Sequence, residues 1–354
     1  LVYAFIWNQF NLGFLNAYTP LIWVLAFVLY DLSYYWLHRC HHEIKFLWAS
    51  HVVHHHGEEF NLSTALRQTG TDFIFKWVFY TPMLFLGVPP EIFVTVAALN
   101  LIYQFWVHTE HIDRLGILDY IFVTPSNHRI HHAQNKEYID ANYGGVFIIW
   151  DILFGTFKDE KKELKPVYGT SKPLKSWNPF WANFEVWTEI FKDTWRTKSW
   201  KDKFRVWISR PKWRPKDVSE KYPIQKNDLK EFKKYDPRVT LFAKIFGFGQ
   251  LVFGSFYSQA FFFNASSMGP TEIFLIGVNV TMILVFASLL FEGKAFGYRL
   301  EVVRAALVLF AIYFGQFEFM QLTVLIHALI CGFLAGYMTI NNKPAEFNEA
   351  RSES

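Results

Sequence analysis

Residues 21–37 read LIWVLAFVLYDLSYYWL, and residues 38–42, which follow directly, read HRCHH. Pro20 precedes the apolar run, and proline is favoured in the first turn of a helix. About 20 apolar residues are needed to cross the roughly 30 Å hydrocarbon core of a bilayer. The run therefore predicts a membrane helix that delivers a histidine cluster to one surface of the membrane.

Other apolar stretches predict that this helix is part of a multi-span bundle, so we expect an all-α integral membrane protein. Residues 1–18 form a first stretch, which we expect to continue a helix that starts before Leu1. Residues 73–88 and 91–107 are joined by a Pro-Pro pair, and we interpret them as a helical hairpin that enters the bilayer and returns. Four further stretches follow later in the chain, at about 239–263, 272–291, 302–317 and 319–338.

A basic segment, residues 158–238, separates the two sets of apolar stretches. It holds 22 Lys/Arg against 12 Asp/Glu, a net charge of +10, whereas the whole chain carries only +4. Nucleic-acid binding is one interpretation of basic residues mixed with aromatic ones. The positive-inside rule and the preference of indoles for the headgroup level instead favour a cytoplasmic segment that lies on the bilayer, with no nucleic-acid partner. Its tryptophans are Trp177, Trp181, Trp187, Trp195, Trp200, Trp207 and Trp213.

The pattern predicts three parts: a membrane-embedded catalytic part at 1–157, the basic interfacial segment at 158–238, and about four C-terminal membrane helices with a short tail at 239–354. If the basic segment is cytoplasmic, the hairpin at 73–107 starts and ends on that side. The helix at 21–37 then ends there as well. All histidine clusters would face the cytosol, as a shared metal site requires.

Twelve of the thirteen histidines lie between residues 38 and 132. Spacings of three and four place side chains on one face of a helix, so we expect each helix to direct two or three imidazoles toward one point. A single pair of histidines at such a spacing is usually a coincidence, but this many histidine clusters are not. Imidazole suits iron, zinc or copper, and eight or nine ligands exceed the needs of one ion, so two metals are expected. The clusters read HRCHH at 38–42, HVVHHH at 51–56, HTEH at 108–111 and HRIHH at 128–132.

Some residues near the clusters are expected to have other roles. His41, His56 and His111 break the spacing and are expected to be spare. His327 stands alone in an apolar run, and we expect a hydrogen-bonded core histidine. Cys40 is a conceivable thiolate ligand of a metal, although the histidines supply enough ligands without it.

The HxxxH motif at 38–42 and the HxxHH motifs at 51–55 and 128–132, with the apolar hairpin before the last, resemble the eight-histidine signature of the fatty acid hydroxylase/sterol desaturase superfamily. The resemblance covers residues 20 to about 160. Within the superfamily, further stretches are similar to the branch that oxidises alkylglycerol ether lipids. Those stretches are HR at 38–39, HE at 42–43, NLSTALRQ at 61–68, YQFW at 103–106, HTE at 108–110, TPS at 124–126, IWD at 149–151 and FGTF at 154–157.

The resemblance implies a non-haem di-iron site, with two irons per chain, that uses molecular oxygen to oxidise a membrane lipid. For the ether-lipid branch it further implies tetrahydrobiopterin as reductant, and cleavage of an alkylglycerol to an aldehyde and a glycerol derivative. It also implies that Glu43 is a catalytic carboxylate of the site. Carried onto the matching positions, the metal ligands would be His38, His42, His51, His54, His55, His108, His128, His131 and His132.

Two alternatives are open at this point. The first is a sterol or fatty-acyl hydroxylase or desaturase that takes electrons from a separate protein, ferredoxin or cytochrome b5. The second is a non-enzymatic metal or haem transporter, but transport would need ligands strung through the bilayer rather than gathered at one face. Glu43 and Glu110 are candidate acceptors for imidazole N–H groups. Asp31, at membrane depth, is either functional or hydrogen-bonded to a neighbouring helix.

Overall fold

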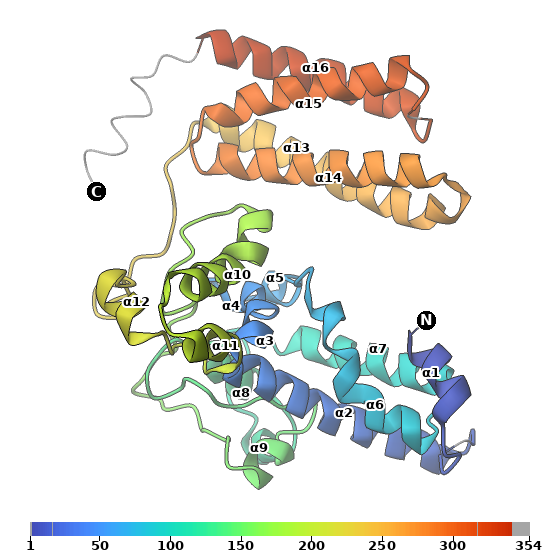
Figure 1. Cartoon of the computed structure of the whole chain (residues 1–354), viewed down its shortest axis with the longest axis vertical. Helices are drawn as coiled ribbons and strands as arrows, with labels where there is room; N and C mark the ends of the chain where they lie inside the picture. Colours follow the sequence, from blue (N-terminus) through green and yellow to red (C-terminus); the bar gives the residue numbers. More distant parts are fainter. Residues whose placement is uncertain (1, 16, 317, 342–354) are drawn as a thin grey trace. The chain divides into compact units, whose positions relative to one another are not determined.

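A computed structural model of the chain describes residues 2–15, 17–316 and 318–341 (Figure 1). Every regular element in these ranges is a helix, and two isolated β-bridges add to them. The chain divides into two compact units, residues 1–174 with 183–234 and residues 175–182 with 235–354. Our division into three parts remains a prediction. Parts of its outer segments, residues 1, 16, 317 and 342–354, lie outside the described residues.

The first unit is built on four longer helices. Pro20 stands in the first turn of its longest helix, and the Thr19 side chain caps that helix by accepting from the Ile22 backbone N–H. Gly87 ends the first helix of the predicted hairpin, and it adopts the left-handed backbone conformation with φ of 94°. The four helices are α1 (Val2–Phe10), α2 (Pro20–Glu43), α6 (Trp77–Leu86) and α7 (Pro90–Trp106).

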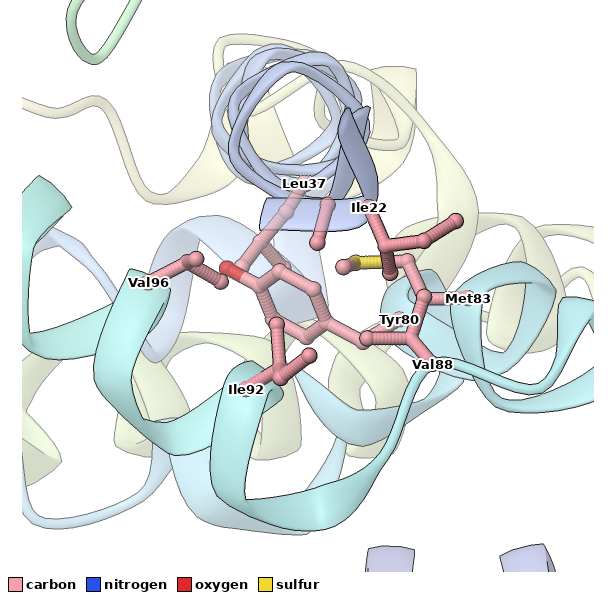
Figure 2. Close-up of a cluster of buried hydrophobic side chains, with 8 residues drawn as sticks. Ile22, Leu37, Tyr80, Met83, Val88, Ile92 and Val96 are labelled. Carbon is pink, nitrogen blue, oxygen red and sulfur yellow. The ribbon is translucent and has the colours of Figure 1, made fainter. Parts of the chain in front are cut away.

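Apolar side chains of α2, α6 and α7 point toward one another in a buried cluster (Figure 2). In a bilayer such packing holds helices together by van der Waals contact, because lipid tails are as apolar as the side chains. The cluster consists of Ile22, Ala26, Leu37, Tyr80, Met83, Val88, Ile92 and Val96.

The histidine-bearing part of the unit is made of short helices that follow α2 and α7. The predicted apolar run ended at residue 37, but α2 continues to Glu43 and so carries the first histidine cluster itself. A capping box between Thr124 and Asn127 opens the helix that carries the last cluster. The short helices are α3 (Lys45–Ala49), α4 (Val52–His55), α5 (Leu62–Ala65), η1 (Asp72–Ile74), η2 (Gly116–Tyr120), α8 (Pro125–His131) and α9 (Ile149–Leu153).

The basic segment forms α10 (Pro179–Arg196), α11 (Trp200–Ile208) and α12 (Lys216–Lys221), of which residues 183–234 belong to the first unit. Its inner side packs on the short helices that follow α2. The buried residues of that contact are Val186, Ile190 and Val206, against Ala49 and Val52.

The second unit consists of α13 (Leu241–Asn264), η3 (Ala265–Ser267), α14 (Pro270–Phe291), α15 (Phe296–Tyr313) and α16 (Gln321–Asn341). Figure 1 shows its four long helices lying side by side. The helix α15 begins six residues before the predicted stretch at 302–317, and it carries charged side chains that pair inside the bundle. Glu301 and Arg304 form a fully buried ion pair there.

The expectation for His327 is confirmed. Its Nε2 lies 3.0 Å from Gln250 Oε1, and its ring stacks on Phe253 at 3.5 Å between centroids. The Arg304 guanidinium lies 3.5 Å from the Nδ1 of His327 and donates to Asn279 Oδ1. His327 is thus a hydrogen-bonded, half-buried residue packed between helices of the second unit.

Among the described residues, three helices are long and apolar enough to cross a membrane: α2, α14 and α16. The all-helical fold with apolar spanning helices is therefore as predicted. That the hairpin at 73–107 crosses the bilayer, and that the histidine clusters face the cytosol, remain predictions.

Candidate metal centre

The structure gathers all nine histidines that we proposed as ligands into two groups. Within each group the candidate ligand atoms all lie within 4.8 Å of one another. The five-histidine group consists of His38, His42, His51, His55 and His131, and the four-histidine group of His54, His108, His128 and His132.

Each HxxHH segment contributes to both groups. His51 and His55 belong to the five-histidine group, but His54 between them belongs to the four-histidine group. In the segment 128–132 the assignment is reversed, since His131 alone joins the five-histidine group. At 3.6 residues per turn, consecutive residues point about 100° apart, so neighbouring histidines face different centres. Two imidazoles of each segment therefore do face one point, as expected, but the third imidazole of each HxxHH segment faces the other group.

The imidazole nitrogens are spaced as ligands of a common ion would be. The Nε2 atoms of His38 and His51 are 3.0 Å apart, and those of His108 and His128 are 2.9 Å apart. Two nitrogens bound at right angles to one ion, each at about 2.0–2.1 Å, would be about 3.0 Å apart. The buried Nε2 atoms of His42 and His131 have no hydrogen-bond partner at all. The residues present thus fit a pair of metal ions.

Backbone carbonyls fix the orientation of three of the rings. The Nδ1 of His38 lies 2.9 Å from the Tyr143 carbonyl, that of His131 lies 3.0 Å from the Ala141 carbonyl, and that of His108 lies 2.8 Å from the Gln104 carbonyl. A carbonyl can only accept, so each Nδ1 carries the proton and donates it. The Nε2 atom is then left with its lone pair directed at the group, as metal binding requires.

Burial keeps these histidines neutral. It lowers the pKa of His108 from the usual 6.5 to about 4, and it also lowers the pKa of the other candidate ligands outside α2 well below that usual value. Neutral imidazoles offer nitrogen lone pairs at neutral pH without competition from protons. The others are His51, His54, His55, His128, His131 and His132.

The loop at 141–147 supplies two of the three carbonyls and is held by Asp151. One carboxylate oxygen of Asp151 accepts from the Tyr143 N–H at 2.7 Å, and the other accepts from the Gly144 N–H at 2.8 Å. The buried carboxylate thereby fixes the peptide whose carbonyl orients His38. Tyr143 also packs its ring against His38, His42 and His131.

Asp31 holds the other end of the same loop. It is fully buried on α2 and accepts from the Val146 and Phe147 N–H groups at 2.8 and 2.9 Å. Asn100 on α7 donates to it at 2.7 Å. A Cβ at Gly145 would lie 2.7 Å from an Asp31 oxygen, so only glycine fits there. Of the two roles expected for Asp31, the structure shows the hydrogen bond to a neighbouring helix.

Glu43 and Glu110 do not provide the imidazole acceptors that we expected. Glu43 pairs with Arg39 at 3.1 Å, and Glu110 accepts from the Tyr168 hydroxyl at 3.0 Å. For the three rings described above the acceptors are backbone carbonyls instead. Sequence offers no direct signal for a carbonyl, although the glycine pair at 144–145 beside two buried aspartates marks a constrained loop.

The residues expected to be spare fall outside both groups. His41 stacks on His51 with centroids 5.0 Å apart, His56 is buried beside the site, and His111 is exposed. Cys40 is a half-buried free thiol and belongs to neither group among the described residues.

An apolar cavity of about 800 Å³ reaches the histidines from one side. It runs between side chains of α1, α2, α6 and α7, including Ile6, Leu84 and Ala97. Asp72 and Lys76, a partly exposed ion pair, also line it, so the cavity approaches the surface there. The histidines on its wall are His38, His41, His51, His54 and His108.

A polar cavity of about 780 Å³ reaches the histidines from another side. Charged residues of the basic segment line it together with Glu43 and the indoles of Trp48 and Trp213. The histidines on its wall are His42, His55, His56, His131 and His132. Both histidine groups thus contribute to both cavities and stand between them.

Comparison with known proteins identifies the family. The profile of the fatty acid hydroxylase family matches residues 23–156. Alkylglycerol monooxygenases of Xenopus tropicalis and Homo sapiens are 36% and 34% identical, over 87% and 89% of this chain and 69% and 71% of their own. An ornithine lipid hydroxylase of Rhizobium tropici is 34% identical over 38% of this chain and 41% of its own. No solved structure matches the chain.

The chain belongs to the fatty acid hydroxylase family. It is a lipid monooxygenase, an oxidoreductase of a non-haem iron family, and an integral membrane protein. The transporter alternative is thereby set aside. The family match over residues 23–156 includes both histidine groups, Asp31 and Asp151, and the loop at 141–147 that orients His38.

Replacing one histidine in each group tests this centre. We expect His54→Ala and His131→Ala each to bind about one iron per chain instead of about two, because each loses a ligand of a different ion. Both variants should lose turnover while remaining in the membrane. Elemental analysis of the purified protein, combined with an activity assay, measures both effects.

Two histidines serve as controls. His41→Ala removes a buried imidazole that belongs to neither group, and it should keep both irons. His327→Ala, in the second unit, should keep both irons and full activity. Full metal content and turnover in His131→Ala, together with loss of metal in His41→Ala, would overturn the assignment.

Proposed function

We propose that this protein is a di-iron monooxygenase that cleaves an alkylglycerol ether lipid with dioxygen and tetrahydrobiopterin. The observation that carries the proposal is the position of the two histidine groups at the wall of an apolar cavity of about 800 Å³. That volume lies within the range of about 300–1,000 Å³ typical of small-molecule sites. The names of the relatives at 34–36% identity supply the substrate class.

The apolar cavity suits an alkyl chain with a small polar headgroup. Side chains of α1, α6 and α7 would enclose the chain, and the polar residues Gln68, Thr69 and Asp72 on the same cavity wall would meet the glycerol hydroxyls. The ether-bonded carbon lies between chain and headgroup, and the histidines on that wall would face it. A lipid would enter from the bilayer, which α2 is long and apolar enough to cross.

The residues of the two groups would hold one iron each, with five imidazoles for one and four for the other. The irons would supply the activation of dioxygen that oxidation of an unactivated C–H bond needs. Asp31 and Asp151 would hold the loop at 141–147 in place, and the backbone carbonyls of that loop would keep the imidazoles oriented. The buried site would exclude bulk water from the reaction.

The reaction inserts one oxygen atom of dioxygen into the C–H bond next to the ether oxygen. The other oxygen atom leaves as water, after uptake of two electrons from the pterin and two protons. The hydroxylated carbon is a hemiacetal, which separates into a fatty aldehyde and a glycerol derivative.

The polar cavity suits the reductant. A pterin is a flat ring with several N–H donors, and the cavity offers the indoles of Trp48 and Trp213 and the carboxylate of Glu43 beside His42. We propose that Glu43 accepts from the ring and is in this sense a catalytic carboxylate. The polar cavity and the basic segment would lie on the cytoplasmic side, where a soluble reductant is present.

A second candidate is hydroxylation or desaturation of an acyl chain or sterol with a separate electron donor such as ferredoxin or cytochrome b5. The family match and the similarity to an ornithine lipid hydroxylase favour it. The basic segment would then be the docking surface for an acidic donor protein.

An activity assay with defined reductants separates the two candidates. We expect membranes containing the protein to release fatty aldehyde from an alkylglycerol with tetrahydrobiopterin, but not with a ferredoxin and its reductase. Glu43→Gln should lose at least tenfold in pterin-dependent turnover and keep its iron, because the amide is a weaker acceptor. Glu220→Gln, an exposed carboxylate on α12, is the matched control. Turnover of sterols or acyl chains alone, or only with the protein donor, would contradict the ether-lipid assignment.

Filling the apolar cavity tests the substrate path. Ala97 of α7 lines the cavity, whereas Thr95 on the same helix is exposed and does not. We expect Ala97→Phe to lower kcat/KM for long-chain substrates at least tenfold and for short-chain ones much less, because the ring occupies the space of the chain. Thr95→Phe should leave both unchanged. An equal effect of Ala97→Phe on all chain lengths would mean that the chain lies elsewhere.

A further inference from the structure

The outward face of α10 and α11 is unusually aromatic. Trp195 is 87% exposed, Trp200 74% and Phe204 73%, and Phe191 and Ile208 are more than half exposed as well. Residues 191 and 195 on α10, and 200, 204 and 208 on α11, follow one another at intervals of four, so they form a stripe along each helix. Contiguous exposed apolar surface of this kind marks an interaction site.

The stripe is not needed for the core of the first unit. The opposite sides of the same helices bury Val186, Ile190 and Val206 against Ala49 and Val52. The helices therefore have an aliphatic inner face that the fold uses and an aromatic outer face that the first unit leaves exposed.

Basic residues accompany the aromatic stripe. Lys192, Arg196, Lys198, Lys201 and Arg205 are exposed on or beside the two helices. Two acidic residues lie within this run: Asp193 is buried and bound to Arg214, and Asp202 is half-buried in the first turn of α11. Tryptophan and phenylalanine beside lysine and arginine are typical of helices that lie in a membrane interface. Interfaces between proteins are also rich in aromatic residues and arginine, but they are depleted in lysine, so the exposed lysines of this face favour a lipid surface.

Hydrogen bonds tie the end of α11 to the residues that follow α2. The apolar helix α2 ends at Glu43, and α3 begins two residues later at Lys45. The Lys45 N–H donates to the Ser209 carbonyl at 2.8 Å, and the Lys45 ammonium donates to the Trp213 carbonyl. The end of α11 is therefore tied to the end of a helix that is long and apolar enough to cross the membrane.

We propose that the aromatic stripe of α10 and α11 inserts into the surface of an anionic bilayer, with its basic residues at the lipid phosphates. This inference does not depend on which lipid the enzyme oxidises. Docking would also steady one wall of the polar cavity, because Arg210, Trp213 and Arg214 follow α11 directly and line that cavity.

Spin labels in the full-length protein test the proposal. Nitroxides are placed at Trp195→Cys or Phe204→Cys, in a background in which Cys40 and Cys331 are serine, and the protein is placed in nanodiscs. The control is Lys216→Cys on α12, whose native side chain is 89% exposed. Power saturation compares collisions of each label with oxygen, which concentrates in lipid, and with a water-soluble nickel complex.

We expect labels at 195 and 204 to favour oxygen, and the control label to favour nickel. Nanodiscs with phosphatidylglycerol should increase the oxygen preference over phosphatidylcholine alone, and Lys192→Glu with Lys201→Glu should reverse that increase. Preference for nickel at both positions would overturn the proposal. Spin–spin broadening would assign the face to a second copy of the chain, and protection from both reagents would assign it to another part of the same chain; both results contradict lipid docking.

Discussion

Nine imidazoles packed into one buried region impose a constraint on the rest of the first unit. Their nitrogens approach within 2.9 to 3.2 Å, which is too close for lone pairs that face one another without a shared proton or cation. Neutral rings have few protons to share, and burial keeps them neutral. Two metal ions, one in each group, would satisfy the arrangement. The elements around it, from the end of α2 to the loop at 141–147, have the geometry needed to present these nitrogens.

The spacing of the histidines made much of the site predictable. Intervals of three and four selected eight of the nine histidines that the structure gathers into the two groups, and the family resemblance added His108. The three histidines expected to be spare, His41, His56 and His111, lie outside both groups. How the nine divide between two centres was not predictable in the same way, because that depends on the placement of α4 and α8 against α2. The HxxHH motif by itself suggests that its histidines share one metal centre, whereas its two adjacent histidines belong to different groups.

The supporting interactions were harder to foresee, because they are long-range and use the backbone. Asp31 and Val146 are 115 residues apart, and no local pattern links them. The apolar runs predicted the helices of both units, but α2 extends past its apolar run and α15 starts before its own. In each case the added part of the helix carries charged or polar residues that find partners inside the structure. The cavities likewise depend on packing between distant segments.

The two cavities reach the same two histidine groups from different sides, so an apolar substrate and a polar reductant can approach the site without sharing a path. The claim on which this account depends is that each group binds iron through nitrogen. Iron K-edge X-ray absorption of the purified protein tests it most directly. We predict a first shell of about four to five nitrogen or oxygen atoms per iron, with the outer-shell scattering of imidazole rings. A sulfur scatterer, which would implicate Cys40, or a first shell without imidazole scattering, would contradict it.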